Sequence, residues 1–347
     1  MIKIQAAAPT LATFILVATV LTRPASAADQ ALVDAAKKEG RVTWYTTLVI
    51  DQFARPASEA FEKKYGIKVD YVRTTSNEVQ LRVMNEARAG RVQADVADSV
   101  GQASILRNEN ALARWLPDVA KTMAPQFIDR EGRWIATTHF VLTPGYNTQL
   151  VSKGGEPKTF EALLDPKWKG KIAVASIPVP ASAPGFVGVV LAHMGEEKGM
   201  DYLRRLAKQD IVDVGIAAGR PIVDQLIAGE HAIALQIFHH HAAISAAQGA
   251  PVGWIAMQPA FANLQISSVL EKAPHPAAGR LLLDFLVSRE AQTIFRDANY
   301  LPVDPGVPPR DPSLRPDDKN LKVIWFSPGE IERSMPRWTQ VWKDVFR

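Results

Sequence analysis

The sequence predicts an α/β protein with two lobes, each built on a mainly parallel β-sheet flanked by helices. Segments with helical periodicity alternate along the chain with short segments rich in β-branched and aromatic residues. This alternation favours parallel sheets covered by helices. The chain has 347 residues, about twice the usual size of a domain, so two lobes are expected. It contains no cysteine, and core burial must therefore stabilise it without disulfides.

Residues 1–27 have the features of a cleavable secretory signal peptide. Lys3 precedes an apolar run from Leu11 to Leu21, and Ala25-Ser26-Ala27 provides the small-x-small pattern that signal peptidase cuts. The apolar run is shorter than the roughly 20 residues that a membrane-spanning helix needs. We therefore expect cleavage before Ala28, export to the periplasm, and a mature chain without a membrane anchor.

The first part of the mature chain contains repeated helix and strand patterns. The expected helices cover 29–40, 53–66 and 77–91, and the strands that follow them cover 41–49, 67–74 and 94–100. Gly40 and Gly66 are placed to end the first two helices. In parallel sheets, ligands bind beyond the carboxyl ends of the strands. The residues at these ends are small, polar and uncharged: Thr46, Thr47, 74–77 and 99–102.

The middle of the chain repeats the same organisation. A strand is expected over 170–177, a loop rich in proline and small residues over 178–185, and a helical region over 186–209 with breaks at Gly195 and Gly199. Residues 220–238 predict a helix ended by Gly229 and then a strand. Two amphipathic helices follow, one beginning near Pro276 and one over 337–346.

Charge and motifs exclude several classes of function. The chain has 40 Lys and Arg against 36 Asp and Glu, and losing Lys3 and Arg23 with the signal peptide leaves a net charge of only +2. The charges are interspersed, so no nucleic-acid-binding surface is expected. The sequence has no G-x-S-x-G, H-E-x-x-H, phosphate-loop or G-x-G-x-x-G motif. An enzyme, such as a metal-dependent hydrolase using the histidines near Asp224, is therefore disfavoured.

Several segments resemble the extracellular solute-binding proteins of ABC importers, in particular the group that takes iron(III), thiamine or phosphonates. The most specific are "DPKWKGKI" (165–172) and "APHPAAGRLLLDFLVSREAQ" (273–292). "FEKKYGIKVDYVR", "NEARAGRVQADVADS", "GYNTQLV" and "YLPVDP" extend the resemblance over nearly the whole mature chain. By themselves these segments are explained by packing: the first suits a turn anchored by Trp168, and the second places an apolar stripe on a helix.

The resemblance implies a type II periplasmic-binding-protein fold, in which two lobes close on a ligand by hinge motion. The chain is then expected to cross between lobes near 137–144 and 263–269. The implied N-terminal lobe is 28–140 plus 264–304, and the C-terminal lobe is 141–263 plus 305–347. It further implies a monomer that needs no cofactor and delivers its solute to an ABC permease and ATPase. The alternative that the protein delivers its solute to a different carrier or to a sensor remains open.

Three adjacent histidines, His239, His240 and His241, follow the expected strand that ends at Phe238. This region resembles the corresponding region of the group's iron-binding members, which have adjacent tyrosines where this chain has histidines. The hard phenolate oxygens of tyrosine suit iron(III). Imidazole suits softer divalent metals, and three consecutive residues point in different directions, so at most two should face one site. Three roles remain open for these histidines: contact with a polar or anionic ligand, a metal site, or a hydrogen-bonded structural role.

The predicted cleft is rich in neutral hydrogen-bond donors, which suit a small polar or anionic organic solute. Arg220 could add a charged contact or be a surface residue, and Tyr300 could cover the site or pack beneath a turn. Iron(III) or another metal is the alternative ligand. The candidate ligand-binding residues are Thr46, Thr47, Ser76, Asn77, Ser99, Gln102, Tyr146, Ser182, Phe238, His239 and His240, with His239, His240 and His241 as the alternative metal ligands.

Overall fold

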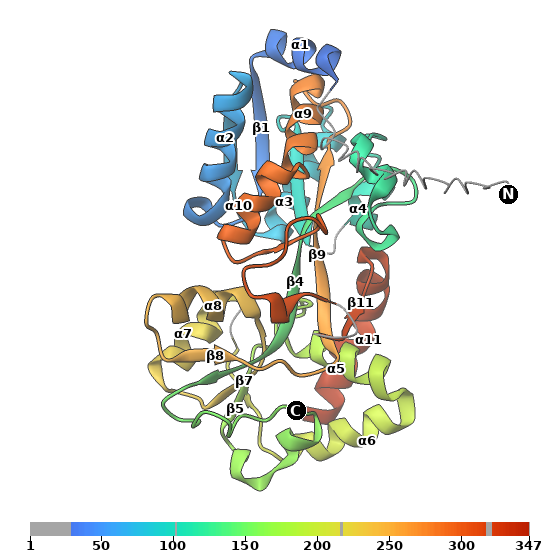
Figure 1. Cartoon of the computed structure of the whole chain (residues 1–347). Coiled ribbons are helices and arrows are strands. Elements are labelled where there is room, and N and C mark those ends of the chain that lie inside the picture. The colour runs from blue at the N-terminus through green and yellow to red at the C-terminus, as the bar shows by residue number, and fades with distance from the viewer. Residues whose placement is uncertain (1–28, 101–102, 216–217, 317–320, 347) are drawn as a thin grey trace, which may run out of the picture.

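The chain folds around one mixed sheet that runs through both lobes (Figure 1). The computed structural model describes residues 29–100, 103–215, 218–316 and 321–346, so the predicted signal peptide and Gln102 lie outside the described residues. Along the sheet the strands follow the order β2-β1-β3-β9-β4-β7-β5-β6. Within the described residues, no helix combines the length and apolar character needed to cross a bilayer.

The first lobe contains the helix and strand units that the sequence predicts. Strand β1 pairs in parallel with both β2 and β3. The short helix α4 (Ala103–Asn108) follows β3. The helices are α1 (Gln30–Glu39), α2 (Arg55–Tyr65) and α3 (Ser76–Arg88), and the strands are β1 (Arg41–Thr46), β2 (Lys68–Arg73) and β3 (Val96–Val100).

Two boundaries in this lobe differ from the prediction. β1 ends at Thr46 instead of continuing to Val49, because Thr46 Oγ1 accepts a hydrogen bond from the Leu48 amide (3.1 Å) and turns the chain. The helix expected from Phe53 is preceded by a π-helical turn, η1 (Ile50–Ala54), that continues into α2. Residues 47–49 therefore form a loop at the carboxyl edge of the sheet.

Two long antiparallel strands, β4 (Ile135–Asn147) and β9 (Ala260–Val269), connect the lobes (Figure 1). The carboxyl half of β9 lies between β3 and the first half of β4. The second half of β4 pairs instead with β7 (Ile233–Phe238) of the other lobe. Both segments expected to cross between the lobes lie on these two strands.

The second lobe has its own parallel strands and helices. β5 pairs in parallel with β6 and with β7. The predicted break at Gly195 is confirmed, but that at Gly199 is wrong. Gly199 lies inside α6, where a side chain would come within 3.0 Å of Leu191, so it permits close helix packing. The elements are β5 (Ile172–Val174), β6 (Val212–Asp213), α5 (Ala183–Met194), α6 (Glu196–Ala207), α7 (Arg220–Ala228) and α8 (His239–Ala247).

The last part of the chain contributes to both lobes. α9 (Pro276–Leu286) and α10 (Arg289–Asp297) join the core of the first lobe, where Phe285 and Phe295 are fully buried. α11 (Pro328–Phe346) begins earlier than residue 337, where the sequence predicted it, and packs on α5. The remaining strands are β8 (Val252–Trp254), β10 (Leu301–Pro302) and β11 (Val323–Trp325). Short helical turns are η2 (Asp118–Thr122), η3 (Pro125–Phe127), η4 (Glu161–Leu164), η5 (Pro166–Trp168) and η6 (Pro312–Leu314).

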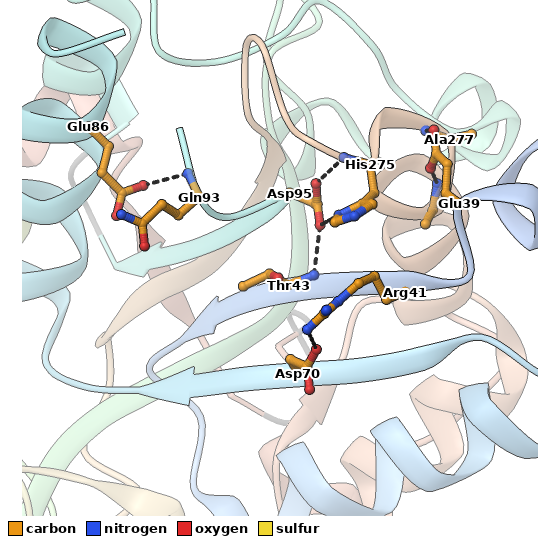
Figure 2. A network of polar contacts seen from close by, with 10 residues as sticks. Glu39, Arg41, Thr43, Asp70, Glu86, Gln93, Asp95, His275 and Ala277 are labelled. Atoms are coloured by element: carbon orange, nitrogen blue, oxygen red, sulfur yellow. Dashed lines mark hydrogen bonds and ion pairs between the residues drawn. The ribbon is translucent and has the colours of Figure 1, made fainter. Parts of the chain in front are cut away.

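A polar network fixes the start of α9 to the first lobe (Figure 2). The Asp95 carboxylate accepts hydrogen bonds from the Thr43 amide (2.7 Å) and the His275 amide (2.6 Å). Burial raises the pKa of Asp95 although these hydrogen bonds favour its charged form. At the end of α1, Glu39 accepts a hydrogen bond from the Ala278 amide (2.7 Å) and caps α9. The chain is thus anchored to β1 and α1 after it returns from the second lobe.

Candidate ligand-binding site

A cavity of about 820 Å³ lies where the carboxyl ends of the first-lobe strands face the helix starts of the second lobe. The first lobe contributes the loop after β1, the start of α3 and Tyr300. The second lobe contributes the starts of α7 and α8, and Phe140 and Gln265 come from the connecting strands. This is the edge of the sheet at which ligands bind in α/β proteins.

The structure brings together only part of the predicted site. Thr47, Ser76, Phe238 and His240 line the cavity, and so does His241. Asn77 lies in the first turn of α3 but not on the cavity wall. Ser99 lies on β3 opposite Ile266, but its side chain is outside the described part of the chain. The predicted residues that lie away from the cavity wall are Thr46, Tyr146, Ser182 and His239.

Local contacts explain why those residues point elsewhere. The Ser182 hydroxyl donates a hydrogen bond to the Val179 carbonyl (2.6 Å) and thereby closes the loop before α5. Tyr146 packs over Gly253 of β8, where a side chain would meet its ring. His239 faces the sheet, with Nδ1 3.3 Å from the Val141 carbonyl oxygen.

Two arginines from different lobes line the cavity. Arg73 is the last residue of β2, and Arg220 is the first residue of α7. Arg220 Nε donates to Asp224 (2.7 Å) and Nη1 donates to the Ser245 hydroxyl (2.8 Å), so its guanidinium is held in place. The cavity-lining carboxylate of Asp51 already forms an ion pair with Arg55 (2.8 Å). The charged side chains that line the cavity are thus two guanidinium groups and one carboxylate, which gives the wall a small excess of positive charge.

Helix starts add to this positive potential. α7 follows Gly219 and α8 follows Phe238, and neither helix has a side-chain cap or an acidic residue in its first turn. Uncapped amide groups and the helix dipole favour an anion at such ends. Gly219 has φ of 114°, a conformation that side chains rarely adopt, so glycine is needed where the chain turns into α7. In contrast, Thr75 and Glu78 cap α3 reciprocally.

The two histidines that face the cavity are neutral. Burial lowers the pKa of His240 well below its usual value, and electrostatic interaction with the neighbouring His241 and His239 lowers it further. Burial and then the guanidinium of Arg220 lower the pKa of His241 to about 4. The imidazole of His240 packs against the rings of Phe140 (5.2 Å between centroids) and Tyr300 (4.7 Å), which also contact each other (5.9 Å). These rings form an aromatic part of the cavity wall beside the arginines.

Within the described residues, no group of three His, Cys, Asp or Glu side chains is arranged to hold a metal ion.

A buried carboxylate supports the floor of the cavity. Asp98 accepts hydrogen bonds from Thr46 Oγ1 and Ser267 Oγ, both at 2.6 Å. Burial raises the pKa of Asp98 to about 6 against the effect of these bonds. Nearby, Gln265 Nε2 donates to Thr47 Oγ1 (2.7 Å), while Gln265 Oε1 is buried and has no hydrogen-bond partner among the described residues. Thr46 therefore belongs to the support beneath the site.

Sequence reasoning missed Arg73, Phe140 and Gln265. Arg73 directly precedes the polar strand end at Thr74, so the strand-end rule would have found it one residue earlier. Phe140 and Gln265 lie within long buried strands, and only the alternation of side chains across the sheet places them toward the cavity. No local motif marks them.

Residues 95–330 match the family described as bacterial extracellular solute-binding protein. This match covers more than half of the chain, and the chain belongs to that family, as the sequence resemblance predicted. Among curated proteins it is 26% identical over 264 residues to "Iron uptake protein A1" of Synechocystis sp., covering 72% of each chain. It is 24% identical over 280 residues to the "Fe(3+)-binding periplasmic protein" of Serratia marcescens, covering 72% of this chain and 74% of that protein.

Solved structures of solute-binding proteins share the fold. The substrate binding protein of the ABC transporter from Agrobacterium tumefaciens superposes with a TM-score of 0.73 at 21% identity, over 88% of this chain and 94% of that one. AfuA from Actinobacillus pleuropneumoniae, with exogenous fructose-6-phosphate bound, superposes with a TM-score of 0.70 at 23% identity, over 88% and 98% of the two chains. The two-lobed periplasmic-binding-protein fold is confirmed.

Proposed function

We propose that this protein is the periplasmic binding component of an ABC importer and captures a small anionic organic solute between its lobes. The observation that carries the proposal is the cavity wall, where Arg73 and Arg220 meet two uncapped helix starts. Such a surface attracts anions and repels cations. In this proposal the protein acts as a monomer after removal of residues 1–27 and performs no chemistry on its ligand.

Capture follows from closing the lobes about the crossing strands. The lobes are proposed to comprise 28–140 plus 264–304 and 141–263 plus 305–347, so that β4 and β9 bend near their middles. Closure brings the loop after β1 and the start of α3 toward the starts of α7 and α8, and excludes water from the ligand. Charged contacts become stronger as water leaves. The permease then receives the closed, loaded form in preference to the open form.

Iron(III) is the second candidate ligand, and the names of the curated relatives favour it over an organic anion. In this chain Asp51 and Tyr300 are cavity residues with hard oxygen donors, and His240 and His241 add imidazole nitrogens. Burial raises the pKa of Tyr300 to about 12, so iron(III) would have to displace a tightly held proton from the phenol. Positive wall charge opposes a bare cation, and an anion bound with the metal would be needed to offset it.

A thermal-shift measurement separates the two candidates. The protein from Ala28 onward is heated with iron(III) nitrilotriacetate, with and without excess chelator, and with small organic phosphates and carboxylates. A ligand present at 100 times its Kd should stabilise the fold by about 2.7 kcal/mol. We expect organic anions to raise the melting temperature and iron(III) to have no effect that chelator reverses.

Matched variants identify the residues responsible. Arg73→Gln should remove the shift produced by organic anions, while Tyr300→Phe, which keeps the ring but removes the hydroxyl, should leave it in place. If the shift comes only from iron(III), disappears with chelator and is lost in Tyr300→Phe, the protein is an iron receptor and the first proposal is wrong.

A further inference from the structure

We infer that the first lobe carries a second binding site, which takes an organic ammonium cation with an apolar body. The site is a cavity of about 550 Å³, and none of the described residues that line it also lines the cavity between the lobes. It lies between the turns η2 and η3, the end of α9, the start of α10 and the segment 303–305 that follows β10. Cavities of this size commonly hold small molecules.

A carboxylate without a partner indicates the charge of the ligand. Asp284 lies in the last turn of α9 and lines the cavity, and among the described residues its carboxylate forms no hydrogen bond or ion pair. Burial raises the pKa of Asp284 to about 6; Lys64 lowers this pKa and Asp118 raises it. Lys64 is not on the cavity wall, and its Nζ pairs with Glu290 (2.9 Å). A bound cation would therefore supply the ion pair that Asp284 lacks.

The other charges around this cavity do not offset Asp284. Arg289 Nε already pairs with Asp304 Oδ2 (3.3 Å), so the described lining side chains have an excess of one negative charge. The last turn of α9 contains no basic residue, and the negative end of its helix dipole adds to this excess. At the start of α10 the Ser288 hydroxyl accepts from the Ala291 amide (3.4 Å), and an acidic residue lies in the first turn. The cavity thus favours a cation, unlike the cavity between the lobes.

The apolar part of the wall indicates that the cation has a carbon body. The apolar lining residues include Val119, Met123, Ala124, Phe127, Val287 and Val303. The ring of Phe127 is held against His139 (5.9 Å between centroids) and Trp325 (5.3 Å). A metal ion needs several oxygen ligands, which Asp284 alone does not supply. An alkyl- or arylammonium ion instead gains both the ion pair and the burial of its apolar part.

The test uses three probes that separate the charge from the apolar body. Backbone NMR spectra of the protein from Ala28 onward are recorded at pH 8, where Asp284 is ionised, during titration with 2-phenylethylammonium, neutral 2-phenylethanol and methylammonium. We expect 2-phenylethylammonium to bind at millimolar concentration and to shift the amide signals of 119–124 and 284–289. The other two probes should each bind at least about 10-fold more weakly. Absence of binding, equal affinity for 2-phenylethylammonium and 2-phenylethanol, or shifts only at 47–52 and 218–221 between the lobes would each overturn the inference.

Variants test the carboxylate and the cavity separately. Asp284→Asn should weaken 2-phenylethylammonium binding at least about 10-fold, and it should fold because it removes a charge that burial disfavours, which its melting temperature checks. Asp118→Asn is the matched control and should bind like wild type, since Asp118 pairs with Lys121 (2.6 Å) and is not on the cavity wall. Ala124→Trp, at an exposed position of the wall, should fill the cavity and block binding. Unchanged binding in Asp284→Asn or Ala124→Trp, or equal losses in Asp284→Asn and Asp118→Asn, would overturn the inference and leave the proposed function untouched.

Discussion

His139, at the crossing on β4, should make the fold sensitive to acid, and His139→Phe should remove that sensitivity. The side chain is only 4% exposed and packs against the rings of Phe127 (5.9 Å) and Trp325 (5.3 Å). Within the part of the chain that the structure describes, neither ring nitrogen has a hydrogen-bond partner. Burial, with a smaller effect from His239, lowers its pKa from 6.5 to about 3. The folded protein therefore keeps His139 neutral at pH values where the unfolded chain binds a proton.

The size of the effect follows from proton linkage. The part of the folding stability that depends on a neutral His139 is fully present above the unfolded pKa of 6.5. It is lost as pH falls below that value, by about 1.4 kcal/mol for each pH unit. From pH 6.5 to pH 4.5 this amounts to about 3 kcal/mol, since the folded pKa lies lower still. A phenylalanine ring can take the same place between the two aromatic neighbours and cannot titrate.

Urea unfolding of wild type and variant at pH 8 and pH 4.5 measures this contribution. The stability difference in favour of His139→Phe should be about 3 kcal/mol larger at pH 4.5 than at pH 8. His193→Phe, which removes an exposed imidazole at the end of α5, controls for the change in histidine content. A stability difference that is the same at both pH values would show that His139 is not held neutral by burial, and the reasoning would be refuted.

Three further substitutions should change the stability of the fold, the first with a pH dependence opposite to that of His139→Phe. Asp98→Asn should destabilise the protein by about 2 kcal/mol more at pH 4.5 than at pH 8, as measured by urea unfolding of wild type and variant. The pKa of Asp98 is raised to about 6 in the folded protein, so the wild type gains stability as this carboxyl takes up a proton below pH 6, whereas asparagine cannot. A pH-independent cost would contradict this. Gly219→Ala should lower the free energy of unfolding by about 1–3 kcal/mol, because φ of 114° lies outside the regions open to alanine. Gly90→Ala is the comparison and should cost less, because its φ of 66° lies in the left-handed region that alanine can enter. Trp338→Ala should cost about 3–5 kcal/mol, since the ring is 6% exposed and packs on Phe261; a loss below 1 kcal/mol in denaturant unfolding would exclude a core role for α11.

Most of the fold follows from local patterns in the sequence. Gly40, Gly66 and Gly195 end helices as expected because a left-handed or open conformation there stops the backbone hydrogen-bond ladder. Gly199 did not fit this rule, because the same residue type also permits helices to approach closely, and the sequence alone does not distinguish the two uses. The turn after Thr46 depends on a single side-chain hydrogen bond and was likewise not evident from periodicity.

The candidate site could be predicted only in part, for a different reason. Strand ends such as Thr47 and helix starts such as Ser76 are marked in the sequence, and the topology of an α/β sheet brings them to one edge. Gln265 is assembled into the cavity by the register of β9 against its neighbours, which depends on contacts between segments more than 100 residues apart. Register of this kind has no local signature.

Helix geometry directs the three adjacent histidines into two different environments. They begin α8, where successive side chains are rotated by about 100°, so His239 turns to the sheet while His240 and His241 face the cavity. Burial keeps all three neutral, and positive charge on the wall therefore comes from Arg73, Arg220 and the helix starts. A neutral imidazole can donate to an oxyanion or accept from a hydroxyl without adding charge. The histidine run is then better suited to orienting a ligand whose charge is met by the arginines than to holding a cation between them.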